Sequence, residues 1–170
     1  MAEAKPSRMT RAEFIETFGR VFEHSAWVAE RTWEMGQDAL WDTADGLHRA
    51  MAAAVDLASD DDKLALLCAH PDLAGRLALA GDLTRESARE QSSAGLDQCT
   101  PEELERFTGL NDAYRARFGF PFIMAVRGAN RADILAAFER RLQNSRDDEL
   151  ATTLAEVKKI ALLRLRDLLP

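Results

Sequence analysis

Helix start signals recur along nearly the whole chain, each followed by apolar residues three or four positions apart. Thr10 and Glu13 form a capping box, in which each side chain can satisfy a free backbone amide at the start of a helix. Thr100 is followed by Pro101 and by two acidic residues that favour the positive end of the helix dipole. Because this spacing places apolar side chains on one helix face, the sequence predicts an all-α fold.

Start and stop signals divide the chain into helices with short connections. The helices expected are one that begins at Thr10 and carries apolar residues to Phe22, three over residues 26–36, 46–57 and 63–69, and four that begin at Thr84, Thr100, Asn130 and Ser145. We therefore expect a single-domain helical bundle of about seven to nine helices over residues 10–170. Residues 1–9 are expected to form a flexible tail.

A short apolar segment, residues 120–126, departs from the helical pattern. It lies between glycines and by its pattern could be a strand. No second convincing strand exists to pair with it, and an isolated strand would leave backbone groups without partners. We expect an extended, buried connector.

Composition and charge argue against several classes of partner. The 170 residues include 22 basic and 29 acidic side chains, and a net charge of −7 disfavours binding to nucleic acid or to an anionic membrane. No apolar run approaches the roughly 18 residues of a membrane helix, and residues 1–9 have no signal-peptide core. The C-terminal Leu-Leu-Pro differs from the Ser-Lys-Leu type of peroxisomal address. Two cysteines outside any Cys-x-x-Cys pair favour reduced thiols in the cytoplasm.

His70 is the first of three polar residues in unusual positions. It lies where a helix is expected to end, directly before Pro71. An imidazole, with an ordinary pKa near 6.5, suits proton transfer at neutral pH. The common alternative is a histidine that only complements the helix dipole. His24 and His48 carry no pattern that would assign them a role.

Glu90 belongs to a polar face of the helix expected after Thr84. Ser87, Glu90 and Gln91 share that face and supply a hydroxyl, a carboxylate and a carboxamide. Such a face is either solvated or lines a polar pocket. Other charged residues already supply an outward face on this helix, so a pocket would explain the second polar face.

Arg164 falls on an apolar seam of the last helix. The other members of the seam are Leu150, Leu154, Val157, Ala161 and Leu168. Burying a guanidinium without a partner costs several kcal/mol, so an anion should meet Arg164. An internal salt bridge, snorkelling near the helix end, or a carboxylate substrate would each satisfy it.

Motifs for nucleotide, phosphate and metal binding are missing from the sequence. It has no Gly-x-Gly-x-x-Gly, phosphate loop, His-Glu-x-x-His or nucleophile elbow. His70 and Glu90 alone are too few ligands for a metal site, so none is predicted. An enzyme with this sequence would work by acid–base chemistry with charges already in place.

Four blocks of sequence stand out together. They are His-Pro-Asp-Leu-Ala-Gly at 70–75, Leu-Thr-x-Glu-Ser-x-x-Glu-Gln-x-x-Ala-Gly-Leu at 83–96, the stretch from Leu-Asn at 110 to Val-Arg-Gly at 128, and Glu-Val-x-x-Ile-Ala-x-Leu-Arg-Leu at 156–165. In content and order they resemble the 2-oxo-4-hydroxy-4-carboxy-5-ureidoimidazoline (OHCU) decarboxylases. The resemblance covers most of residues 10–169.

The resemblance implies an all-α enzyme, usually a homodimer, that needs no cofactor and converts OHCU to (S)-allantoin in urate degradation. It implies that His70 is the catalytic acid–base residue and that Glu90 and Arg164 complete the site. The substrate contacts it implies are Pro71, Ser87, Ala88, Arg89, Glu90, Gln91, Phe122, Ile123, Met124, Ala125 and Val126. Two alternatives stay open: a non-catalytic helical interaction module, and a hydrolase of a related ureido intermediate.

Overall fold

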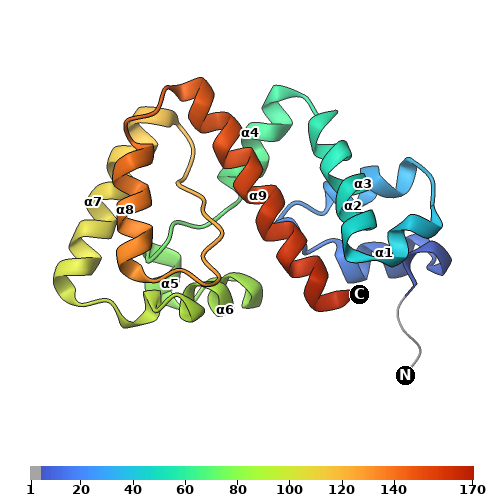
Figure 1. The fold of residues 1–170 in the computed structure, drawn as a ribbon, viewed down its shortest axis with the longest axis horizontal. Coiled ribbons are helices and arrows are strands. Elements are labelled where there is room, and N and C mark those ends of the chain that lie inside the picture. The colour runs from blue at the N-terminus through green and yellow to red at the C-terminus, as the bar shows by residue number, and fades with distance from the viewer. Residues whose placement is uncertain (1–4) are drawn as a thin grey trace. The chain divides into compact units, whose positions relative to one another are not determined.

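The computed structural model describes residues 5–170, which form nine α-helices, three short 3-10 helices and no strand (Figure 1). The α-helices are α1 (Arg11–Phe18), α2 (Trp27–Glu34), α3 (Ala44–Asp56), α4 (Asp60–Cys68), α5 (Arg76–Ala80), α6 (Arg85–Ser93), α7 (Pro101–Phe118), α8 (Arg131–Arg141) and α9 (Arg146–Leu168), and the 3-10 helices are η1 (Pro6–Arg8), η2 (Ala39–Asp42) and η3 (Leu96–Gln98). The predicted all-α class and helix number are confirmed. Within the described chain, none of the helices has both the length and the apolar character to cross a membrane.

The chain forms two compact units. Among the described residues, the first contains residues 5–69 together with Val157–Pro170, and the second contains His70–Glu156. The boundary falls inside α9, so this helix begins in the second unit and ends in the first. The prediction of one domain over residues 10–170 stays a prediction.

Aromatic side chains form the centre of the first unit. The Phe14 ring lies 5.4 Å from that of Trp33 and 5.3 Å from that of Trp41, measured between ring centroids. The C-terminal half of α9 joins this unit through a hydrogen bond of 2.9 Å between His48 Nε2 and the carbonyl oxygen of Lys158. Burial lowers the pKa of His48 below its ordinary value.

The first helix ends earlier than its apolar pattern predicted. α1 stops at Phe18, and Val21 and Phe22 are buried from the irregular segment that follows. The amide of Gly19 donates to the carbonyl oxygen of Ile15, and a Cβ on Gly19 would lie 2.5 Å from that oxygen. The buried face therefore continues past the end of the helix.

The second unit is built around the aromatic residues of α7, α8 and the segment between them. α7 and α8 lie side by side (Figure 1). Phe122 stacks on Phe138, with ring centroids 3.7 Å apart, and the Tyr114 ring meets Phe122 edge-on at 5.4 Å. Residues 120–126 belong to no helix or strand and all except Met124 are buried, which confirms the predicted buried connector.

The predicted seam of α9 is wrong in the first half of the helix. Leu150 and Leu154 are only half-buried there, and Leu168 at the other end of the helix is exposed. Glu149 and Thr153 are fully buried instead. They occupy core positions because Tyr114 and Arg141 hydrogen-bond to both of them, which satisfies the polar atoms.

The shortest helices were not predicted from the sequence. The five-residue α5 is too short to show a helical period, and the 3-10 helices leave no such pattern either. Residues 1–4 of the expected tail lie outside the described residues. In the rest of it, the Ser7 backbone amide and hydroxyl donate to the Asp42 carboxylate at 2.9 and 2.7 Å, so η1 is anchored to η2.

Two glycines of α7 should respond oppositely to alanine. Gly119 ends the helix with φ +81°, so Gly119→Ala should lower the free energy of unfolding by about 1 kcal/mol. Gly109 lies inside the same helix, and Gly109→Ala should raise that free energy by up to about 1 kcal/mol. An added Cβ would meet no atom within 4 Å at either position, so the difference is conformational. Urea unfolding followed by circular dichroism measures both, and shifts of the same sign would contradict the argument.

Candidate active site

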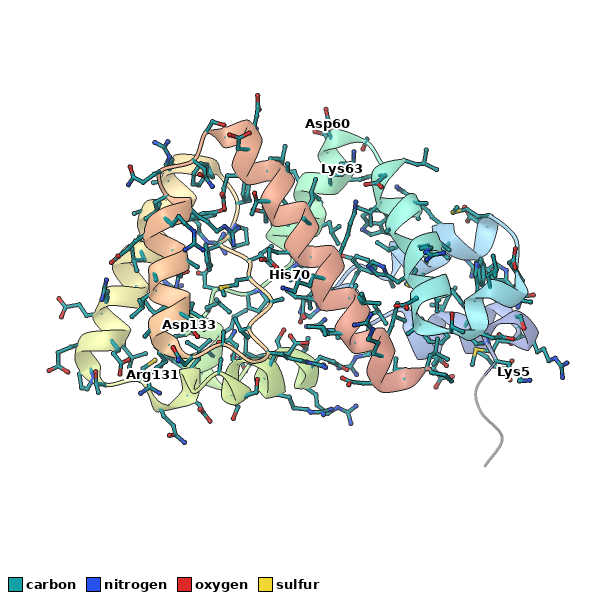
Figure 2. All side chains as sticks on the ribbon, in the orientation of Figure 1. Lys5, Asp60, Lys63, His70, Arg131 and Asp133 are labelled. Atoms are coloured by element: carbon teal, nitrogen blue, oxygen red, sulfur yellow. The ribbon has the colours of Figure 1, made fainter. Side chains whose placement is uncertain are left out.

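His70 lies in the loop between α4 and α5 (Figure 2). α4 ends at Cys68, close to the predicted end, but begins at Asp60 rather than at Lys63 because Ser59 caps it. His70 is 6% exposed, so its imidazole is largely shielded from bulk water. The following Pro71 prevents the helix from continuing.

Two side chains from other helices hold the backbone of this loop. The Oε1 atom of Gln91 accepts from the Ala74 amide at 3.0 Å, while its Nε2 donates to the Asp72 carbonyl oxygen at 3.2 Å. The Nδ2 atom of Asn111 donates to the carbonyl oxygen of Leu73 at 3.0 Å. Three successive residues of the loop are therefore tied to α6 and α7.

The loop adopts a backbone conformation that needs this support. Ala74 has φ +49°, a left-handed conformation that costs a non-glycine residue about 1 kcal/mol. A Cβ on Gly75 would lie 2.6 Å from Asp72 Cβ, so the tight approach requires glycine. Arg115 donates twice to the Asp72 carboxylate, at 3.1 and 2.9 Å, and closes the loop from α7.

The polar face predicted on α6 points inward. Ser87 and Gln91 are buried and Glu90 is half-buried, whereas Ala88 and Arg89 are exposed on the other side. Thr84 caps the helix by accepting from the Ser87 amide at 3.2 Å. The solvated-face interpretation is therefore wrong for this helix.

The connector of residues 120–126 is held at two backbone positions. The Nη1 atom of Arg141 donates to the Ile123 carbonyl oxygen at 2.7 Å, and its guanidinium lies 4.3 Å above the Phe122 ring. The Glu156 carboxylate accepts from the Ala125 amide at 3.3 Å. Side chains of α8 and α9 thus supply hydrogen bonds to polar groups of this irregular interior backbone.

The charged group that holds this connector was missed by the sequence analysis. Arg141 and Glu149 form a buried ion pair, with Nε and Oε1 2.6 Å apart. Tyr114 and Asn144 donate to the same carboxylate, at 2.6 and 2.9 Å. Burial, and next the hydrogen bond to Glu149, raise the pKa of Tyr114 far above its ordinary value, so its hydroxyl remains a donor. Each partner lies on a different element, and charge patterns along one helix cannot reveal such a contact.

Arg164 lies in the first unit, where it is 5% exposed. Its Nη2 donates to Glu23 Oε2 at 2.9 Å, and its Nη1 donates to the Val21 carbonyl oxygen at 3.3 Å. The Glu23 side chain is 1% exposed, and the neighbouring His24 has φ +47°. The expectation that an anion meets Arg164 is confirmed, and the anion in the structure is an internal carboxylate.

The predicted site residues are divided between the two units. His70, Glu90 and every predicted substrate contact belong to the second unit, and Arg164 belongs to the first. The convergence of the three catalytic side chains on one cavity stays a prediction. Within the second unit, Gln91 connects α6 directly to the loop that carries His70.

A pocket of about 460 Å³ lies among α5, α6, η3 and the start of α7. Leucine and alanine side chains form most of its wall, and neither His70 nor Glu90 lines it. Cys99 does line it, and burial raises the pKa of this thiol, which keeps it protonated at neutral pH. The pocket therefore lacks the charged groups expected at the predicted site.

Comparisons with known proteins agree with the four sequence blocks. The family model described as OHCU decarboxylase matches residues 7–166. A relative from Halalkalicoccus jeotgali named 2-oxo-4-hydroxy-4-carboxy-5-ureidoimidazoline decarboxylase is 46% identical over 158 residues, which are 93% of this chain and 86% of the relative.

Two solved structures share the arrangement of helices. One is described as (S)-allantoin synthase and superposes with a TM-score of 0.77 at 38% identity, over 96% of this chain and 52% of the solved chain. Another is described as OHCU decarboxylase in the presence of (S)-allantoin, with a TM-score of 0.69 at 25% identity, over 88% of this chain and 94% of the solved chain. This chain thus spans about half the length of the first solved chain and nearly all of the second.

Proposed function

The chain belongs to the OHCU decarboxylase family, and we propose on that premise that it decarboxylates OHCU to (S)-allantoin in urate degradation. The observation that carries the proposal is the way three of the sequence blocks meet at one loop. Gln91 from the second block and Asn111 from the third hydrogen-bond to the backbone of the first, directly after His70. Blocks of sequence far apart in the chain thus fix the surroundings of the residue proposed to carry out proton transfer.

The proposed reaction uses the substrate as its own electron sink. The bond between the ring carbon and the carboxylate breaks, carbon dioxide leaves, and the electron pair enters the conjugated C=N bond of the ring. A proton is then added to the ring carbon that becomes the stereocentre of allantoin. Acid–base groups and fixed charges suffice for these steps.

Each of the three catalytic groups has a separate role in this proposal. His70 delivers the proton to one face of the ring, which yields a single enantiomer. Glu90 orients the ring and its hydroxyl through hydrogen bonds. Arg164 holds an anionic group of the substrate or its delocalised negative charge. A guanidinium has five N–H donors in a fixed fork, so pairing with Glu23 can orient Arg164 for this role.

The proposed substrate contacts are Pro71, residues 87–91 and residues 122–126. Within them, Gln91 acts on the loop backbone, because both ends of its carboxamide bind residues of that loop. Arg141 and Glu156 hold the backbone of residues 122–126 by hydrogen bonds.

The proposal is tested by supplying OHCU in situ, from enzymatic oxidation of urate with the upstream hydrolase present. We expect faster release of carbon dioxide than the spontaneous rate, together with a circular dichroism signal from one allantoin enantiomer. Racemic allantoin at the spontaneous rate would instead identify a non-catalytic interaction module. Consumption of substrate without carbon dioxide would identify a hydrolase.

The quaternary structure and location are part of the same proposal. We expect a homodimer, which the family resemblance implies, and sedimentation equilibrium should give twice the mass of the chain. Both cysteines are free thiols, which suits the reducing cytoplasm.

A further inference from the structure

Asn111 is a buried polar side chain of α7 to which the proposed mechanism gives no role. It is 4% exposed and its Nδ2 donates to the carbonyl oxygen of Leu73 at 3.0 Å. Its Oδ1 is buried and has no hydrogen-bond partner among residues 5–170. The side chain therefore makes one hydrogen bond, and that bond goes to the loop that carries His70.

An unsatisfied buried oxygen destabilises a folded protein, because its hydrogen bonds to water are lost without replacement. An apolar side chain of similar size would avoid this loss in a core that already contains Phe107 and Tyr114. A contribution to folding is thus a poor explanation for a carboxamide here. The Nδ2 donor of Asn111 explains the carboxamide better, because the Leu73 carbonyl oxygen is also buried in this region and needs a partner.

The hydrogen bond from Asn111 lies at the centre of a set that restrains the loop backbone. Gln91 holds the groups on either side, the Asp72 carbonyl and the Ala74 amide, and Asn111 holds the Leu73 carbonyl between them. Ala74 has φ +49°, so this stretch would relax to another conformation without such restraints. A change in the backbone at residue 73 reaches Pro71 through two peptide groups and His70 through three.

We propose that Asn111 is a positioning residue for the decarboxylation, which fixes the loop so that the His70 imidazole faces the ring carbon it protonates. The inference rests on the proposed function of His70. Misplacement of a catalytic group by about 1 Å can cost about 10²-fold in rate. Asn111 acts through the loop and needs no contact with the substrate.

Asn111→Leu tests the proposal because it keeps the branching and the number of heavy atoms of the side chain and removes the donor. We expect kcat to fall by about 10- to 100-fold with a KM change of less than about threefold, since orientation is lost and binding is largely retained. We also expect a lower enantiomeric excess of allantoin. Asn111→Gln retains the carboxamide and should recover part of kcat. Asn111→Ala, which removes the donor with less bulk, serves if the leucine variant folds poorly.

Phe107→Leu is the matched control, because it disturbs the same helix one turn earlier and removes no hydrogen bond to the loop. Rates are compared per folded protein, and the concentration of each variant is adjusted to give the same catalysed rate before enantiomeric excess is measured. Loss of enantiomeric excess in Asn111→Leu but not in Phe107→Leu would support positioning. Equal enantiomeric excess in both, or an unchanged kcat in Asn111→Leu, would overturn it. Failure of the wild-type chain to release carbon dioxide would overturn the proposed function instead.

Discussion

His70→Asn should reduce the catalysed release of carbon dioxide by about 10²- to 10⁴-fold, the range that a positioned general acid–base group contributes. The allantoin that still forms should be racemic, because solvent then protonates the ring without preference for a face. Asparagine is smaller than histidine and polar, so the protein should keep its fold with asparagine at this buried position. A carboxamide, however, does not titrate near neutral pH and cannot exchange a proton with the substrate.

The measurement combines carbon dioxide release with circular dichroism of the product, at matched concentrations of folded protein. His48→Gln is the control, since glutamine can retain the hydrogen bond to the Lys158 carbonyl oxygen and the residue has no role in the proposed chemistry. This control should keep the wild-type rate. Undiminished, stereoselective turnover by His70→Asn would remove His70 from the mechanism.

Local signals explain why most helices could be predicted from the sequence. The capping box at Thr10 forms as expected, and the helix start predicted at Thr100 also has a capping box; Glu13 and Glu103 accept from the cap amides at 2.7 and 3.0 Å. Such contacts join residues three positions apart, so the sequence alone contains both partners. The left-handed conformation of Gly119, which ends α7, is likewise a local signal, because it is a property of one residue.

Contacts between distant residues explain what could not be predicted. The mistaken half of the α9 seam depends on Glu149, which is polar and yet fully buried. Its position follows from Arg141 and Tyr114, which lie on two other helices. Hydrophobic periodicity cannot identify a buried carboxylate, because the partners that make its burial tolerable lie outside its own helix.

The candidate site shows the same division. His70, Glu90 and Arg164 were singled out because each breaks a local rule, such as a histidine before proline or an arginine on an apolar seam. Asn111 breaks the same rule on α7, because it lies on the apolar face between Phe107 and Tyr114, but the sequence analysis missed it. Only the fold reveals that it faces the loop of residues 70–75.

A double variant separates the two interpretations of Arg164. Arg164→Met alone should lower the free energy of unfolding by about 3–5 kcal/mol, because it removes one partner of a buried ion pair and leaves the Glu23 charge in place. It should also lower kcat by about 10²- to 10³-fold if the guanidinium stabilises negative charge on the substrate. In Glu23→Gln/Arg164→Met both charges of this ion pair are removed, so most of the stability should return.

Activity of that double variant decides the role of Arg164. If the arginine serves only as an internal ion pair, turnover should recover together with stability, since nothing needed for chemistry is missing. We expect turnover to stay low in a stable protein, because methionine cannot bind the anionic substrate whatever occupies position 23. Thermal unfolding and carbon dioxide release, measured on the two single variants and the double variant, give the coupling in both quantities. Coupling in stability without coupling in turnover would mean that Glu23 orients Arg164 and that Arg164 meets the substrate. Parallel recovery of stability and turnover in the double variant would leave the mechanism with His70 and Glu90 alone.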